Sequence, residues 1–115
     1  MKDEAFEVLA IMVLIIVGAL AMNYLGSGDI ENRYAAATFT RCVSEHPDWR
    51  EADCQRISRQ IIWLGMTDEQ ARMSWLKPKK INRSVGSWGV HEQWVYGDYG
   101  RYLYFENGIL TSWQN

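Results

Sequence analysis

The sequence predicts an α+β fold in which an N-terminal transmembrane helix is followed by short helices packed on a three- to four-stranded antiparallel sheet. Three observations lead to this prediction. An uncharged apolar stretch lies near the N-terminus, and a helical pattern with capping signals follows it. From Lys79 onward the apolar residues instead alternate with a period of two. At 115 residues, the chain has room for one small folded domain after the apolar stretch.

The apolar stretch near the N-terminus has the length of a membrane span. Val8–Leu25 contains eighteen residues without a charge, and Ala5 and Phe6 extend it to roughly the 20 residues that a spanning helix needs. Ala19-Leu20-Ala21 also has the small-x-small form of a signal-peptidase site, which leaves open whether the segment is a retained anchor or is cleaved after Ala21. The expected boundaries are a flank at 1–4, an anchor at 5–25, a linker at 26–33 and an α+β envelope domain at 34–115.

Charged residues balance in the part of the chain that follows the apolar stretch. From Gly26 onward there are eleven Lys and Arg against eleven Asp and Glu. Nucleic acids attract proteins that carry a basic excess, so no nucleic-acid partner is expected. Six Trp and six Tyr are unusual in so short a chain, and they crowd toward its C-terminal third. That third is therefore expected to hold the core, a recognition surface or both.

A helical hairpin is expected over residues 34–60. Residues 30–45 favour a first helix that ends before Pro47, because the residue preceding a proline is displaced from the α region. Asp48 is the expected N-cap of a second helix over 49–60, and Glu51 has the spacing of an acidic capping box.

The two cysteines lie at matching positions on the two arms of this hairpin. Cys42 is five residues before Pro47 and Cys54 is seven residues after it, so a disulfide is geometrically reasonable. The bond would stabilise the fold by roughly 2–3 kcal/mol in the chain-entropy model, and it would indicate an oxidising compartment. Two alternatives stay open from the sequence: reduced thiols in a cytosolic protein, and a metal site with His46, although the spacing matches no zinc pattern.

The second half of the domain begins with a short helix and continues as a sheet. Thr67 and Gln70 have the spacing of a capping box, and Pro78 forbids a helix beyond Trp75 or Leu76. Strands are expected over 80–85, 88–96, 101–106 and 109–113, with turns at Gly86, Gly97–Gly100 and Asn107-Gly108.

The third of these strands shows how the sheet is expected to be covered. Leu103 and Phe105 share one face, whereas Tyr102 and Tyr104 share the other. One face is expected to pack on the helices, which would leave the other face rich in Tyr and Trp.

Several motifs in residues 61–114 together resemble a known family. They are Gly65-Met66-Thr67-x-Glu69-Gln70-Ala71, Trp75-x-x-Pro78, Gln93-Trp94-Val95-Tyr96 and Tyr104-Phe105-Glu106-Asn107-Gly108. In this order they look like the SmpA/OmlA (BamE-like) small bacterial envelope proteins. The resemblance implies helices packed on a small antiparallel sheet, an extracytoplasmic location, and a binding or assembly role rather than catalysis.

The chain departs from that family in two respects. Leu76 stands where the family usually has glycine, and a leucine adopts positive φ there only at a cost of about 1 kcal/mol. The family's lipid-anchoring cysteine is also absent, because no Cys lies beside the apolar stretch. We therefore expect a single-pass bacterial inner-membrane protein with its C-terminal domain in the periplasm, and only the fold and broad class carry over.

The sequence contains no strong catalytic or metal-binding motif. His91-Glu92 begins like the zinc-protease motif, but Val95 occupies the position of its second histidine and the stretch is a predicted strand. No Gly-x-Ser-x-Gly and no phosphate-binding glycine loop is found. Neither an enzyme, nor a cofactor, a metal or a small-molecule substrate is expected.

A basic cluster precedes and enters the first predicted strand. It consists of Lys77, Lys79, Lys80 and Arg83. Such a cluster could contact phosphates or lipid head groups, but we interpret it as a solvated edge that discourages aggregation between sheets.

The leading functional hypothesis is a membrane-anchored, non-enzymatic module that binds or assembles with another envelope protein. Its candidate contact residues are Trp88, Tyr99, Tyr102 and Tyr104, since Tyr and Trp are enriched in interface hot spots. One alternative is an inhibitor-like or structural domain that occupies a partner's site, with Tyr99 at the tip of its inserted turn. Another is a cytosol-facing small membrane protein of unknown role.

Overall fold

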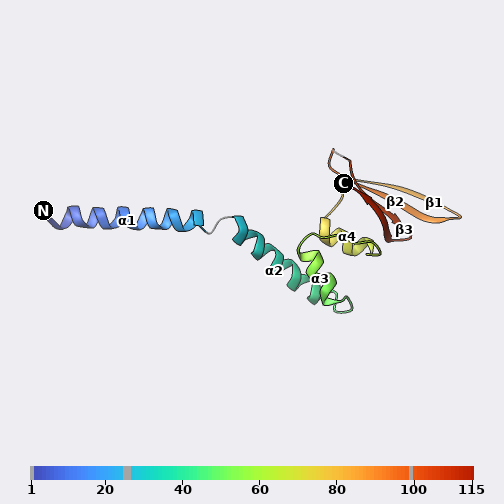
Figure 1. Ribbon diagram of the computed structural model, residues 1–115, viewed down its shortest axis with the longest axis horizontal. Helices are drawn as coiled ribbons and strands as arrows, with labels where there is room; N and C mark the ends of the chain where they lie inside the picture. The colour runs from blue at the N-terminus through green and yellow to red at the C-terminus, as the bar shows by residue number, and fades with distance from the viewer. Residues whose placement is uncertain (1, 25–26, 99) are drawn as a thin grey trace. The chain divides into compact units, whose positions relative to one another are not determined.

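The computed structural model describes residues 2–24, 27–98 and 100–115, and within them it contains four helices and a four-stranded antiparallel sheet (Figure 1). The elements are α1 (Lys2–Tyr24), α2 (Ser27–Glu45), α3 (Glu51–Ser58), α4 (Asp68–Trp75), β1 (Lys80–Gly86), β2 (Gly89–Tyr96), β3 (Arg101–Glu106) and β4 (Ile109–Gln114). The chain divides into two compact units, Met1–Tyr34 and Ala35–Asn115. The predicted α+β class is confirmed.

The first unit contains α1, whose apolar side chains are exposed where they are described. Phe6 is 73% exposed and Leu14 is 71% exposed. In the described ranges, no helix combines the length and the apolar character that crossing a membrane requires. The transmembrane anchor expected at 5–25 is therefore not confirmed, and its last residue, Leu25, lies outside the described residues.

Helix α2 begins earlier than the sequence indicated. The linker expected at 26–33 is helical from Ser27 onward, whereas Gly26 lies outside the described residues. Asp29 lies in the first turn, where its negative charge favours the helix, and its carboxylate is 3.4 Å from the guanidinium of Arg33. These local interactions favour a helix over a flexible polar linker.

The connection between α2 and α3 differs from the predicted cap. The N-cap residue of α3 is Arg50 and not Asp48, and the helix begins at Glu51. The preceding residues form a turn in which the Trp49 amide donates to the His46 carbonyl at 3.1 Å. In that turn the rings of His46 and Trp49 stack, with their centroids 3.7 Å apart and an interplanar angle of 6°. This stacked turn takes up residues that the predicted helix would have contained.

The disulfide between Cys42 and Cys54 is confirmed, and it joins α2 to α3 with Cα atoms 5.7 Å apart. Neither the reduced-thiol nor the metal alternative is what the structure shows. Both cysteines are fully buried and form a small core with Ile57. Its partly buried neighbours are Phe39, Trp49, Trp63 and Met73.

Helix α4 has the predicted capping box. The Gln70 amide donates to the Thr67 hydroxyl at 3.1 Å, and the Thr67 amide donates to the Gln70 side-chain oxygen at 3.0 Å. The helix ends at Trp75, as the following Pro78 requires. These reciprocal bonds satisfy two of the free amide donors at the start of a helix that is only eight residues long.

Leu76, which follows α4, has a backbone conformation that is strained for a leucine. Its φ of 64° and ψ of −166° lie in a region that is used almost only by glycine. The Tyr96 hydroxyl donates to the Leu76 carbonyl at 2.8 Å and holds this conformation in place. Burial raises the pKa of Tyr96 to about 12, although Arg72 and Arg101 lower it, so the hydroxyl keeps its proton at neutral pH.

Replacing this leucine with glycine is expected to stabilise the protein. We expect Leu76→Gly to raise the free energy of unfolding by about 1 kcal/mol, because glycine adopts positive φ without a Cβ penalty. Urea unfolding followed by circular dichroism measures the change. Lys77→Gly is the matched control, since Lys77 has no positive φ and gains only flexibility in the unfolded state. Equal destabilisation by both changes would contradict the assignment of strain to Leu76.

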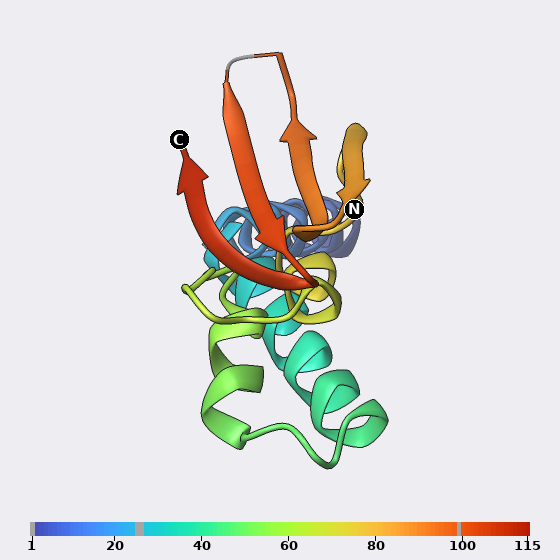
Figure 2. The ribbon, with the colours of Figure 1, turned by 90° about the vertical axis from the view of Figure 1, so that its right-hand side faces the viewer.

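The four strands lie in the order β1-β2-β3-β4, with β1 and β4 at the two edges (Figure 2). Strand β3 has its predicted bounds, and the other three differ from prediction by one residue at one end. One face of the sheet contributes the buried side chains of the main core. This core consists of Trp94, Leu103, Phe105 and Leu110 from the strands, with Met66 and Ala71 from the loop before α4 and from α4 itself.

Candidate functional site

The candidate site lies on the face of the sheet opposite the main core. The register aligns one residue from each strand in a row, which consists of Asn82, Gln93, Tyr104 and Ser112. Side chains alternate between the two faces, so this row points away from the buried Trp94. We call this surface the open face, and define it as Asn82, Ser84, His91, Gln93, Tyr102, Tyr104, Glu106 and Ser112.

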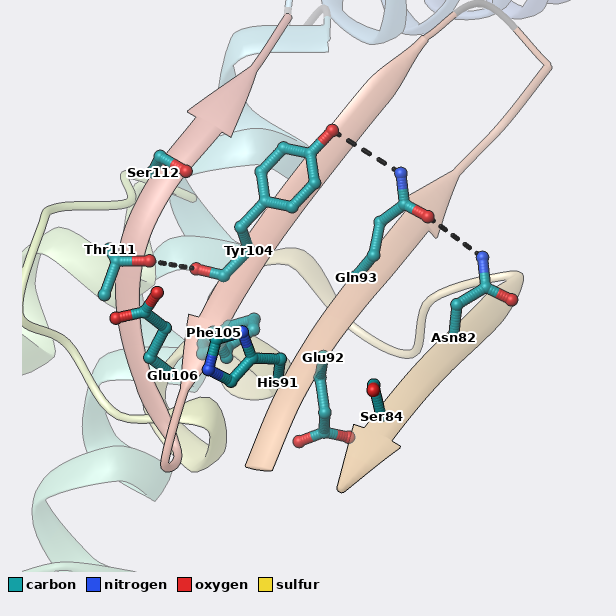
Figure 3. Close-up of a pocket in the computed structure, with 10 residues that line it drawn as sticks. All are labelled: Asn82, Ser84, His91, Glu92, Gln93, Tyr104, Phe105, Glu106, Thr111 and Ser112. Carbon is teal, nitrogen blue, oxygen red and sulfur yellow. Dashed lines mark hydrogen bonds between the residues drawn. The ribbon is translucent and has the colours of Figure 1, made fainter. Parts of the chain in front are cut away.

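A shallow hollow of about 370 Å³ lies on the open face (Figure 3). Amides, hydroxyls, the His91 imidazole and the Glu106 carboxylate line it, whereas the side chains of Glu92 and Phe105 start from the core face of the sheet. The lining residues are Asn82, Ser84, His91, Glu92, Gln93, Tyr104, Phe105, Glu106, Thr111 and Ser112. Most of these groups donate or accept hydrogen bonds, so the hollow suits polar recognition.

Three side chains of the hollow form a chain of hydrogen bonds across three strands. The Asn82 side-chain amide donates to the Gln93 oxygen at 3.0 Å, and the Gln93 amide donates to the Tyr104 hydroxyl at 3.4 Å. Figure 3 shows these contacts as a continuous line from β1 to β3. Because the Tyr104 hydroxyl accepts a hydrogen bond from Gln93, its own proton is available to an acceptor on a partner. These two hydrogen bonds therefore hold the three side chains in position and leave the Tyr104 hydroxyl as a free donor among the described residues.

A β-bulge shapes the side of the hollow formed by β4. The register between β3 and β4 shifts between Tyr104 and Phe105. At this point the Thr111 hydroxyl donates to the backbone carbonyl of Tyr104 at 3.2 Å. A bulge bends its strand and redirects side chains, so it contributes to the concavity of the open face.

Trp88 lies at the end of the open face that is formed by the β1–β2 turn. Its indole crosses Gly86 so closely that a Cβ on that glycine would be 2.4 Å from the ring. The indole also contacts the His91 ring edge-on at a centroid distance of 6.3 Å, and Trp88 is 60% exposed. The turn thus presents an exposed aromatic ring next to the polar hollow.

The structure brings together three of the four predicted contact residues. Tyr102 and Tyr104 lie side by side on the open face with ring centroids 6.3 Å apart, and Trp88 lies at its end. Tyr99 lies outside the described residues. Sequence reasoning missed Asn82 and Gln93, although the predicted hairpin register would have placed them next to Tyr104.

The expectation that the uncovered face is rich in both Tyr and Trp is wrong for Trp. Trp94 is fully buried on the core face. Trp113 pairs with Leu103 and therefore shares the core face, although it is 44% exposed at the sheet edge. The open face has two tyrosines and a majority of polar side chains instead.

The arrangement offers hydrogen-bonding groups but not a set of metal ligands. Within the described parts of the chain, no group of three or more His, Cys, Asp and Glu is placed to hold a metal ion. His91 and Glu92 are neighbours on β2, so their side chains start from opposite faces of the sheet. The hollow can bind a partner's polar groups through its amides and hydroxyls.

Comparisons with known proteins give no match to a family model, to a curated protein or to a solved structure. The resemblance to the SmpA/OmlA group stays a prediction.

Proposed function

We propose that this chain is a membrane-attached, non-enzymatic module that binds another envelope protein through the open face of its sheet. The observation that carries the proposal is the polar hollow of that face, which is lined by Tyr104, with Tyr102 beside Tyr104 and the exposed Trp88 beside His91. Interfaces between proteins favour this combination of aromatic anchors and fixed hydrogen-bonding groups. The family resemblance supports the same class of function.

The chemistry of the open face favours a protein partner over a catalytic role for this site. Asn82, Gln93 and Tyr104 use their polar groups to hold one another in position across the strands. Side chains held in this way lose little conformational entropy when a partner binds. The open face is therefore preorganised for recognition.

Attachment to the membrane rests on α1 and on the sequence that it contains. Val8–Leu25 has no charged residue, and the large apolar side chains from Phe6 to Val17 are 52% to 73% exposed. An exposed helix that is apolar on all sides is favoured in lipid rather than in water. The disulfide favours an oxidising compartment, so we place the folded domain in the periplasm of a bacterium.

Site-specific photo-crosslinking in intact bacterial cells tests this proposal. A photoreactive phenylalanine analogue at Ser112 of the full chain is expected to give a crosslink to an envelope protein, because Ser112 is exposed at the rim of the hollow. The matched control carries the same group at the exposed Gln55 of α3. Tyr104→Ala in the Ser112 variant is expected to reduce the yield about tenfold, since it removes a central aromatic contact.

Two outcomes would contradict the proposal. Crosslinks of equal yield from Ser112 and Gln55 would show that the open face is not the binding surface. A crosslink from Ser112 to cytosolic proteins would contradict the periplasmic placement.

A further inference from the structure

The outer edge of β1 is an unpaired strand edge. At the other side of the sheet, the edge of β4 is partly paired with the loop before α4. The Gly65 amide donates to the Leu110 carbonyl, and the Leu110 amide donates to the Met66 carbonyl, both at 2.9 Å. Among the described residues, β1 pairs only with β2. Its outer amides and carbonyls are therefore free to pair with another strand.

The register shows which backbone groups of β1 face outward. The Asn107 amide donates to the Val90 carbonyl at 2.8 Å, so the backbone groups of Val90 point toward β3. Successive residues of a strand point their backbone groups to alternate sides, so those of His91 point toward β1. His91 pairs with Ser84. It follows that the outward groups of β1 belong to Ile81, Arg83 and Val85.

This edge carries exposed positive charge, and only Arg83 has an acidic residue, Glu92, opposite it in the register. Lys77, Lys80 and Arg83 are exposed, and none has a carboxylate within 4.0 Å in the described part of the chain, whereas Lys79 pairs with Asp98. The sequence from 77 to 91 contains no acidic residue. The charges of the domain balance as a whole, so the edge of β1 is a local excess of positive charge in an otherwise net-acidic domain.

The far end of the same edge is apolar. Val85 is 67% exposed and Trp88, in the turn that follows, is 60% exposed. A strand paired with β1 would therefore meet cations near Lys80 and apolar side chains near Val85.

We propose that the β1 edge binds an extended acidic segment of a partner protein, which adds to the sheet as a fifth strand. Backbone groups of Ile81, Arg83 and Val85 would hold the segment, and Lys80 and Arg83 would select glutamate or aspartate. The inference rests on the proposed function, in that it takes the ligand to be a protein. Charge selects this occupant over a second copy of the chain, because pairing two β1 strands would bring their cations together.

A peptide-binding experiment on the full chain in detergent micelles tests the proposal. The probe is a short blocked, fluorescently labelled peptide of valines with two glutamates three residues apart, because Lys80 and Arg83 point to opposite faces of β1. The control peptide has lysine in place of glutamate. Fluorescence anisotropy is expected to show saturable binding of the glutamate peptide only. Binding should weaken as salt is added, because the selecting charges are exposed.

Two sets of variants separate backbone pairing from charge. Val85→Pro removes an outward amide without removing a bond to β2, and it is expected to weaken binding about tenfold, whereas Val85→Thr keeps the amide and is expected to bind normally. Lys80→Gln combined with Arg83→Gln is expected to weaken binding about tenfold. Arg59→Glu, an exposed change at the C-cap of α3 that alters the net charge by the same two units, is the control for net charge.

The following results would overturn the proposal. Absence of glutamate-peptide binding, or equal binding by wild type and Val85→Pro, would exclude strand addition at β1. Binding to phosphatidylglycerol vesicles but not to the peptide would assign the basic edge to a lipid surface. Sedimentation as a dimer that Val85→Pro dissociates would assign the edge to self-association. Loss of peptide binding with intact crosslinks from Ser112 would leave the proposed function unchanged.

Discussion

Replacing Trp94 with alanine is expected to lower the free energy of unfolding by about 3–5 kcal/mol, as truncation of a buried aromatic residue usually does. Trp94 is fully buried, its ring lies 4.4 Å from that of Phe105, and the guanidinium of Arg72 lies 5.0 Å from its ring. Alanine would leave a cavity at the centre of a small core. Small domains are typically stable by only about 5–15 kcal/mol, so this variant is expected to unfold at much lower urea concentration.

Two control variants make this prediction specific to the core. Trp113→Ala is expected to have a smaller effect, because Trp113 is 44% exposed at the sheet edge. Trp94→Phe is expected to be milder than Trp94→Ala, because it fills part of the space and removes a buried indole N–H that has no hydrogen-bond partner in the described structure. Urea unfolding followed by far-ultraviolet circular dichroism measures all three. Similar losses for Trp113→Ala and Trp94→Ala would show that the core is not centred on Trp94.

Features that depend on local chemistry were predictable from the sequence. The capping box of Thr67 and Gln70 requires only two side chains at a fixed spacing, and the Asn107-Gly108 turn fixes its own hairpin. The alternation that distinguishes Tyr104 from Phe105 is likewise a property of one strand. These elements appear in the structure as their local preference predicts, and the contact between them, in which the Asp68 amide donates to the Gly108 carbonyl at 2.9 Å, is compatible with both.

Features that depend on contacts between separate segments were not predictable in this way. Asp48 has good cap chemistry, but the stacked rings of His46 and Trp49 place it in a turn instead. Likewise, an aromatic residue on a strand does not indicate which face the helices cover. Trp94 and its cross-strand partner Leu103 are buried because Met66 and Ala71, from outside the sheet, pack on the face that they share.

The candidate site also depends on contacts between separate segments of the chain. Asn82 and Gln93 are ordinary polar residues in the sequence, and only the register of three strands places them in a hydrogen-bonded row with Tyr104. The Tyr residues of the open face followed from alternation alone. The hollow required the pairing of β4 with its bulge at Thr111, for which the sequence carries no distinct signal.

Removal of the disulfide by combining Cys42→Ala with Cys54→Ala is expected to lower the free energy of unfolding by about 2–3 kcal/mol. The bond closes a loop with a sequence separation of 12 and restricts the unfolded chain. Both sulfur atoms are also buried in the core that Ile57 shares, so the change removes packing contacts at the same place. Val43→Ala is the matched control, because Val43 is 41% exposed next to Cys42.

Reduction distinguishes the covalent bond from the packing of the two side chains. Dithiothreitol is expected to lower the stability of the wild type toward that of the double variant and to leave the double variant unchanged. Helix α3 contacts α4, and Trp63 packs against both the small disulfide core and the main core. Loosening of the hairpin is therefore expected to weaken packing in the main core as well. Urea unfolding with and without reductant measures this. A wild type whose unfolding midpoint is unaffected by complete reduction would show that packing alone holds α2 on α3.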